Sequence, residues 1–149
     1  IGEWNNDESL LGEIKSLLNN NKNIRDKIQL IPFPPIDKLP EIYHRATCFC
    51  HIQDYDCPAQ CSNPSIWALG CGLPLVSLNM GVFRDYIKNG ENGFLCNNTE
   101  ELSEKMLEIT RSDWKKMSKE SRTIAERDHS SEKIAAKYKK VYEKVLDNL

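Results

Sequence analysis

The stretch CSNPSIWALGCGLPLV, Cys61–Val76, constrains the fold more than any other part of the chain. A serine and an asparagine that can cap a helix precede Pro64, and proline suits the first helical position because its missing N–H costs nothing there. An apolar segment follows, and the sequence Gly-Leu-Pro ends it before the run PLVSL. We therefore expect a helix over residues 64–71 and a strand over residues 74–78, joined by a short connection.

Short apolar runs and amphipathic segments alternate along the rest of the chain. Short connections between strands and helices indicate βαβ units, so the expected fold class is α/β, with a Rossmann-like parallel sheet flanked by helices. The uncharged run TCFCHI favours a strand that is covered on both faces. In addition to the two elements above, we expect strands over residues 27–33, 47–52 and 94–96, and helices over residues 8–18, 39–46, 82–89, 99–109, 112–127 and 131–146.

The last expected helix carries a single apolar stripe. Amphipathic helices normally bury their apolar face in their own domain, so we expect the stripe to belong to the core. A groove for a partner is the alternative. The stripe consists of Ile134, Tyr138, Val141, Tyr142 and Val145.

Length and composition fit one domain over residues 1–149, with 40% hydrophobic residues to form a core. The chain opens with IGEW, which is typical of the end of a strand, so we expect a fragment of a longer two-domain protein. A net charge of −2 provides no long-range attraction for nucleic acid. Apolar runs are well short of the roughly 20 residues that span a bilayer, so we expect no membrane span and a cytoplasmic location.

The six cysteines do not form a pair of CxxC motifs. Cys48 and Cys50 alternate within a strand-like run, so we expect buried, reduced thiols rather than disulfides or a zinc site. The spacing of His44, His51 and His129 fits neither a metal site nor a catalytic triad. We therefore expect no metal and no cofactor, and we assign no catalytic residue.

The loop before the Pro64 helix is the candidate binding site. Parallel sheets bind ligands beyond the carboxyl ends of their strands, where helix N-termini present free N–H groups. The backbone N–H groups of Cys61, Ser62 and Asn63, the Ser62 hydroxyl and the helix dipole can converge on an anion such as a phosphate. An ordinary capped helix without a ligand is the alternative.

The order of three segments extends this local pattern. PEIYHRATCFC, CSNPSIWALGCGLPLVS and NMGVFRDYIKNGENGFL follow one another as in the carboxyl-terminal domain of the group 1 (family 4) glycosyltransferases, which the chain resembles. The resemblance runs from Ile1 through the last helix and is most specific between Ala59 and Leu95. It implies the carboxyl-terminal half of a GT-B fold. This domain would hold a nucleoside-diphosphate sugar, and a missing amino-terminal domain would hold most of the acceptor. The resemblance also implies that the last helix can pack on that missing domain, which would leave part of its apolar stripe uncovered here.

The resemblance also implies which residues bind the donor. The positions whose backbone amides contact the diphosphate correspond to residues 61–64, although Pro64 has no N–H to give. A Gly-Gly pair falls on Gly81 and Val82, followed by an acid at Asp85. The expected donor-binding residues are Cys61, Ser62, Asn63, Trp67, Gly81 and Asp85.

The sequence departs from the family at its two signature glutamates, which fall on Ala59 and Trp67. Neither residue can give the charge-assisted hydrogen bond that a carboxylate gives to a sugar or ribose hydroxyl. Trp67 can stack on a nucleobase or sugar, or it can pack in the core. Asp54 and Asp56 can replace a lost glutamate, or they can be solvated loop residues.

We therefore expect the donor-binding domain of a retaining glycosyltransferase of the hexosyltransferase type, inactive as an isolated fragment. The loss of both glutamates leaves a second hypothesis, a degenerate non-catalytic domain that keeps the fold for binding or assembly. A receiver-like or flavodoxin-like phosphate-binding domain ranks last, because no acidic cluster follows the first strand.

Overall fold

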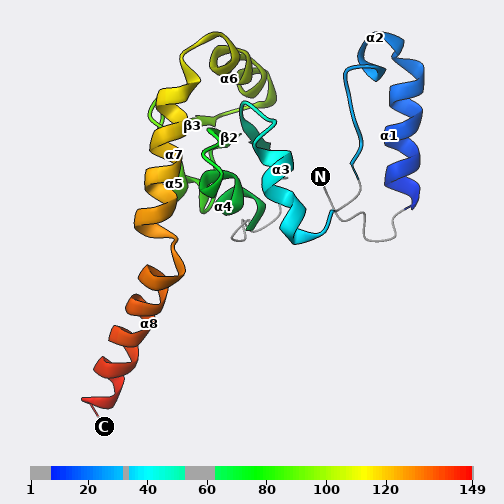
Figure 1. Cartoon of the computed structure of the whole chain (residues 1–149). Helices are drawn as coiled ribbons and strands as arrows, with labels where there is room; N and C mark the ends of the chain where they lie inside the picture. Colours follow the sequence, from blue (N-terminus) through cyan, green and yellow to red (C-terminus); the bar gives the residue numbers. More distant parts are fainter. Residues whose placement is uncertain (1–7, 32–33, 53–62, 149) are drawn as a thin grey trace. The chain divides into compact units, whose positions relative to one another are not determined.

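The computed structural model describes residues 8–31, 34–52 and 63–148 (Figure 1). By its internal contacts the chain divides into two compact units, Ile1–Leu39 and Pro40–Leu149, and we describe each by itself. That residues 1–149 form a single domain stays a prediction.

The first unit contains α1 (Glu8–Asn20), α2 (Lys22–Arg25) and the 3-10 helix η1 (Ile36–Lys38). The predicted strand over residues 27–33 is wrong, because residues 27–31 are described and form no strand. The run is apolar, but it leads into the sequence IPFPP. Prolines have no N–H to donate to a sheet ladder, which accounts for the error.

The second unit contains a parallel sheet of three strands, β1 (Phe49–His51), β2 (Leu75–Leu78) and β3 (Gly93–Cys96), in the order β1-β2-β3. All four residues of the central strand β2 are buried. The three residues of β1 are only half-buried, because within the described part of the sheet β1 pairs on one side alone. The expectation of a strand covered on both faces therefore fits β2 and not β1.

Helices connect the strands and cover the sheet (Figure 1). The helix α4 (Asn63–Gly70) connects β1 to β2, and α5 (Phe83–Tyr86) connects β2 to β3. α4 contacts β1 and β2, whereas α6 (Thr99–Arg111) contacts β2 and β3. The prediction of an α/β, Rossmann-like parallel sheet flanked by helices is confirmed.

The end of α4 shows why the local sequence was informative. The Gly72 N–H donates to the Leu69 carbonyl across 2.8 Å, and the Leu73 N–H donates to the Ala68 carbonyl across 2.9 Å. These bonds close the helix, and Gly72 adopts a φ of +75°, which a residue with a side chain rarely takes. Pro74 then leads directly into β2.

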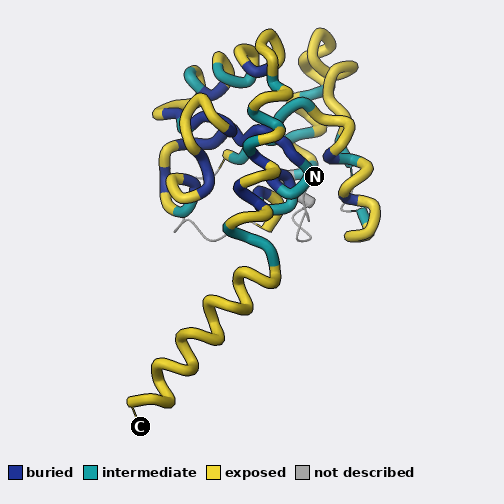
Figure 2. The backbone as a smooth tube through the Cα atoms, turned by 60° about the vertical axis from the view of Figure 1, so that its left-hand side comes forward, coloured by how far each residue is buried: buried dark blue, intermediate teal, exposed yellow. Residues whose placement is uncertain are grey.

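The remaining elements are α3 (Leu39–Tyr43), α7 (Trp114–Asp128) and α8 (Ser131–Leu146). α7 packs on α4 and buries Ile124 and Ala125. The core of the sheet unit is centred on β2 and on the helices around it (Figure 2). Its largest fully buried apolar side chains are Phe83, Leu69, Leu75, Ile109, Ile124 and Val76.

The expectation that the apolar stripe of α8 is buried is wrong. No described residue of α8 is buried, and Figure 2 shows the helix exposed along its length. Val141 is 58% exposed and Tyr142 is 62% exposed. Periodicity indicated an apolar face, but it could not show that the rest of this chain leaves that face uncovered.

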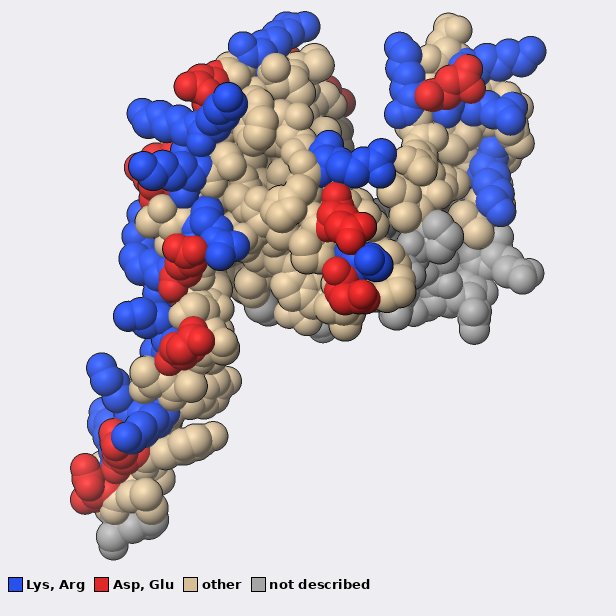
Figure 3. All heavy atoms as spheres, in the orientation of Figure 1, with Lys and Arg blue, Asp and Glu red and all other residues tan. Residues whose placement is uncertain are grey.

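Charged side chains lie along the outer side of α7 and α8 (Figure 3). Basic side chains dominate there, with acidic side chains between them, so the surface carries both signs of charge. Within the described ranges, no helix has the length and apolar character that crossing a bilayer requires.

Candidate functional site

The carboxyl ends of the three strands define the candidate site. The strands are parallel, so His51, Leu78 and Cys96 end at the same edge of the sheet. A helix that connects two parallel strands runs back across the sheet, and α4 therefore begins at this edge. Helix starts attract anions in general; at the start of α4, Asn63 is exposed, Pro64 has no N–H and Ser65 is buried.

The described part of the predicted anion loop is its last residue, Asn63. It is exposed and is the first residue of α4. Next to it, the Pro64 carbonyl accepts a hydrogen bond from the Tyr43 hydroxyl across 3.4 Å, which ties the start of α4 to the end of α3. Burial, with a smaller contribution from Cys71, raises the pKa of Tyr43, so its hydroxyl remains a donor. The other two residues, Cys61 and Ser62, lie outside the described residues.

Trp67, which the resemblance aligns with a signature glutamate, occupies the second turn of α4. It is half-buried, whereas Ser65, Ala68 and Leu69 are buried. Partial exposure is compatible both with stacking on a ligand and with packing, so the role of Trp67 stays a prediction. Ala59, Asp54 and Asp56 lie outside the described residues.

The turn that follows β2 carries the other two predicted residues. Gly81 is exposed with a φ of +45°, and Asp85 is exposed on α5. Between them, Phe83 is fully buried and its ring lies 4.8 Å from that of His51 at the end of β1. Topology therefore brings Asn63, Gly81 and Asp85 to one edge of the sheet, on two neighbouring crossovers.

Two residues of this turn were missed by the sequence analysis, Asn79 and Arg84. The Arg84 Nε donates to Asn79 Oδ1 across 2.9 Å, and its Nη2 donates to the Asn79 carbonyl across 3.1 Å. Both residues are exposed. The available signal was that Asn79 is the first polar residue after the apolar end of β2, where parallel sheets bind ligands.

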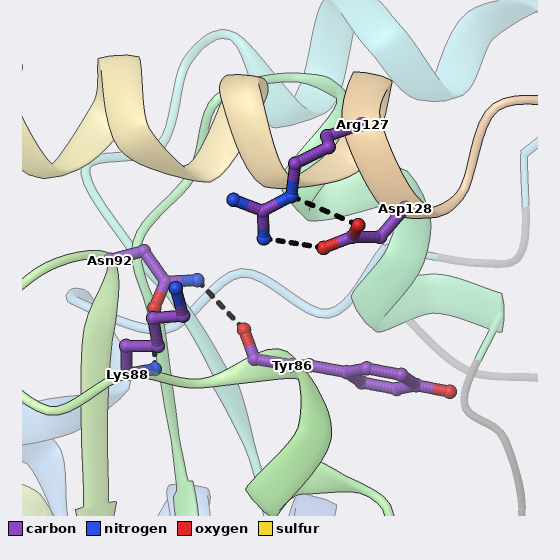
Figure 4. Close-up of polar contacts among 5 residues, drawn as sticks. All are labelled: Tyr86, Lys88, Asn92, Arg127 and Asp128. Carbon is purple, nitrogen blue, oxygen red and sulfur yellow. Dashed lines mark hydrogen bonds and ion pairs between the residues drawn. The ribbon is translucent and has the colours of Figure 1, made fainter.

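A row of aromatic rings leads from the sheet edge to the end of α7. The Phe83 ring is 6.3 Å from the Tyr86 ring, which lies 5.0 Å from the His129 ring. Burial lowers the pKa of His129, so its ring is held in the neutral form. Just before it, Arg127 and Asp128 form an ion pair through two hydrogen bonds (Figure 4).

The described cysteines are free thiols: Cys48, Cys50, Cys71 and Cys96. Cys96 is buried and the other three are half-buried, so among the described cysteines the expectation of burial holds for Cys96 alone. Burial is the main cause that raises the pKa of each, and it raises that of Cys50 to about 11. Such thiols are poor nucleophiles because little thiolate forms at neutral pH. In the part of the chain that the structure describes, no three His, Cys, Asp or Glu side chains group as metal ligands.

Comparison with known proteins shows which family the chain is similar to. A family model described as "Glycosyl transferases group 1" matches residues 1–128. The chain is also similar to spore coat protein SA of Bacillus subtilis (strain 168), with 25% identity over 151 residues that cover 95% of this chain. The match covers 38% of that relative, so the chain spans well under half the length of the curated protein it matches.

Proposed function

Because this chain belongs to the group 1 glycosyltransferases, we propose that it is the donor-binding domain of a retaining glycosyltransferase, the carboxyl-terminal half of a GT-B fold. The complete protein would move a sugar, of the hexosyl type, from a nucleoside diphosphate to an acceptor with retention of anomeric configuration. The match over residues 1–128 supports glycosyl transfer in general. The parallel sheet with flanking helices is the fold that such a domain requires.

One observation supports the donor site most strongly. The first turn of α4 begins at the carboxyl edge of the sheet, and Asn63 is exposed there rather than covered by other side chains. In the proposed complex, the amides of Cys61, Ser62 and Asn63 hold the diphosphate, while Trp67, Gly81 and Asp85 complete the donor site.

The proposed chemistry is stabilisation of a leaving group. As the glycosidic bond breaks, negative charge develops on the diphosphate, and N–H groups fixed at a helix start stabilise that charge. Amides and basic side chains perform this task, so the proposal needs neither a metal nor another cofactor.

The proposal includes a second domain in the complete protein, which would face this one across the donor site. The match covers 38% of the curated relative, which leaves room for the amino-terminal domain that the family resemblance implies. We expect that amino-terminal domain to bind most of the acceptor and expect this chain alone to transfer no sugar. Reduced thiols fit a cytoplasmic location, which stays a proposal.

Nucleotide titration tests the proposal. Amide chemical shifts of the chain are followed by NMR during addition of UDP, GDP and their sugars, with uridine and guanosine as controls lacking phosphate. We expect shifts at Ser62, Asn63 and Gly81 that are larger for the diphosphates than for the nucleosides. A flat response to every nucleotide contradicts donor binding and would favour a non-catalytic domain.

A matched pair of variants localises the binding. Asp85→Asn removes the carboxylate at the proposed site, and we expect it to weaken binding of the nucleotide sugars. Asp113→Asn removes an exposed carboxylate just before α7, and we expect it to leave binding unchanged. If the two substitutions changed binding equally, Asp85 would not be a donor-binding residue.

A further inference from the structure

The guanidinium of Arg84 is held in place at the edge of the sheet. Its Nε donates to Asn79 Oδ1 across 2.9 Å, and its Nη2 donates to the Asn79 carbonyl across 3.1 Å. Asn79 is itself anchored, because its N–H donates to the Cys96 carbonyl across 2.7 Å at the end of β3. A chain of hydrogen bonds therefore connects the end of a strand to a positive charge.

The position of Asn79 fixes where this charge lies. Asn79 directly follows the last residue of β2, so the guanidinium lies at the carboxyl end of the central strand. This is the edge at which α4 begins and at which Gly81 and Asp85 are exposed. A cation at this edge lies on the side of the sheet where parallel α/β folds bind phosphorylated ligands.

Arg84 has hydrogen-bonding capacity left for a ligand. A guanidinium has five N–H donors, and the two bonds to Asn79 use two of them. Among the described residues, no carboxylate lies within ion-pair distance of Arg84, so no close contact neutralises its charge. The side chain is exposed and thus accessible from solution.

We propose that Arg84 contacts the diphosphate of the bound nucleotide and that Asn79 is a positioning residue that holds the guanidinium for this contact. The inference rests on the proposed function and names the positive group that the donor site uses. A planar guanidinium matches phosphate oxygens with parallel hydrogen bonds, which an ammonium cannot do. Fixing the side chain before binding reduces the entropy lost when the ligand arrives.

A purely structural role for Arg84, fastening the turn after β2, gives different results. A structural arginine would affect the whole site, so its loss would weaken the binding of every ligand alike. An arginine that contacts phosphate matters only when phosphate is present. Comparing a nucleoside with its mono- and diphosphate therefore separates the two roles.

The experiment is calorimetric titration of the wild-type chain with uridine, UMP and UDP, repeated with the guanosine series. We expect Arg84→Gln to weaken UDP or GDP binding about 10- to 100-fold, as for loss of charge-assisted hydrogen bonds, and to leave nucleoside binding unchanged. Arg84→Lys should bind the diphosphates more tightly than Arg84→Gln but less tightly than wild type, because lysine keeps the positive charge and cannot make the parallel hydrogen bonds of a guanidinium. Asn79→Ala should weaken diphosphate binding by a few-fold.

Arg111→Gln is the matched control. Arg111 is an exposed arginine in the last turn of α6, which starts after β3 and runs back from the site edge. Its substitution should leave every affinity unchanged. Thermal unfolding of each variant identifies loss of fold, and the Arg84→Lys variant keeps the test decisive if Arg84→Gln does not fold.

The possible failures are distinguishable. If the wild-type chain binds none of the nucleotides, the proposed function is wrong and the role of Arg84 is overturned with it. If the wild-type chain binds UDP or GDP, and Arg84→Gln binds it equally well or loses nucleoside affinity to the same extent, only the inference about Arg84 is overturned.

Discussion

The side-chain amide of Asn92 donates a hydrogen bond to the Tyr86 carbonyl across 2.8 Å (Figure 4). Its Oδ1 accepts from the Lys88 N–H across 2.7 Å, and its side chain is fully buried. One amide group therefore satisfies two backbone groups of the connection from α5 to β3. This connection carries the turn that contains Gly90 and Gly93.

We expect Asn92→Ala to destabilise the protein by roughly 2 to 4 kcal/mol, because it removes the two buried hydrogen bonds that the Asn92 side chain makes to the Tyr86 carbonyl and the Lys88 N–H. Urea unfolding followed by circular dichroism measures the change in free energy of unfolding. Asn19→Ala is the control, since Asn19 is an exposed residue of α1 and its loss should have little effect. Equal midpoints for the two variants would show that the buried amide contributes nothing.

Gly90 and Gly93 provide a matched pair, because both have positive φ values, +77° and +156°. A Cβ on Gly90 would meet no atom within 4 Å, whereas a Cβ on Gly93 would overlap the backbone of Leu75 on β2. We expect Gly90→Ala to cost about 1 kcal/mol of backbone strain and Gly93→Ala at least about 3 kcal/mol. Chemical denaturation of both variants checks the order, and a larger effect at Gly90 would contradict it.

The elements that the sequence predicted well are those with chemical signals at their ends. Pro64 marks the start of α4, and Gly72 with Pro74 marks its end, so the helix and the following strand lie within one residue of their expected positions. Gly90 and Gly93, which follow α5, likewise have positive φ values, which residues with a side chain rarely adopt. At such positions the backbone conformation restricts which residue types fit, so the residue type in the sequence indicates the conformation directly.

Two features could not be predicted from the sequence, the exposure of the α8 stripe and the contact between Arg84 and Asn79. The stripe on α8 is correctly periodic, yet periodicity does not say whether Val141 meets another element. The Arg84–Asn79 contact joins residues five apart across a turn, a spacing that matches neither the helix nor the strand repeat. Its detection requires the three-dimensional path of the chain after β2.

Because α8 is exposed, a valine-to-alanine substitution there should lower the free energy of unfolding much less than the same substitution in β2. Val76 on β2 is fully buried, whereas Val141 on α8 is 58% exposed. We expect Val76→Ala to cost about 2 to 3 kcal/mol through lost burial and a cavity, and Val141→Ala to change stability by less than about 0.5 kcal/mol. Urea unfolding of this chain measures both. A large loss at Val141 would show that the stripe is covered in solution.

The thiol of Cys50 should react slowly in the folded protein. Burial, with smaller contributions from Cys48 and Cys96, raises its pKa to about 11 from an ordinary 9.0. At pH 8 this leaves on the order of a hundredth of the ordinary amount of thiolate, which is the reactive form. We expect iodoacetamide to label Cys50 about a hundredfold more slowly in the native chain than in guanidinium chloride, as measured by mass spectrometry of peptides. Equal labelling rates would contradict the raised pKa of this half-buried thiol.

His129 makes stability depend on pH in a defined window. Burial lowers its pKa below the ordinary 6.5, with Asp128 opposing and Lys137 assisting the shift. The unfolded chain therefore takes up the proton more readily than the folded one. The stability that the neutral His129 ring contributes to the folded state is therefore complete above pH 6.5, and it is lost as the pH falls through the lower folded-state pKa.

The variant His129→Gln tests this window, because it removes the titrating ring while keeping a polar side chain. It also loses the ring contact with Tyr86, so we expect it to be less stable than wild type at neutral pH. Urea unfolding at a series of pH values from about 7.5 to 5 should show the stability difference narrowing as the pH falls, since only the wild type is destabilised by protonating His129. The ion pair of Asp128 with Arg127 lowers the pKa of that carboxyl below 3.8, so it titrates outside the series. A difference that stays constant with pH would show that the His129 ring is not held in the neutral form.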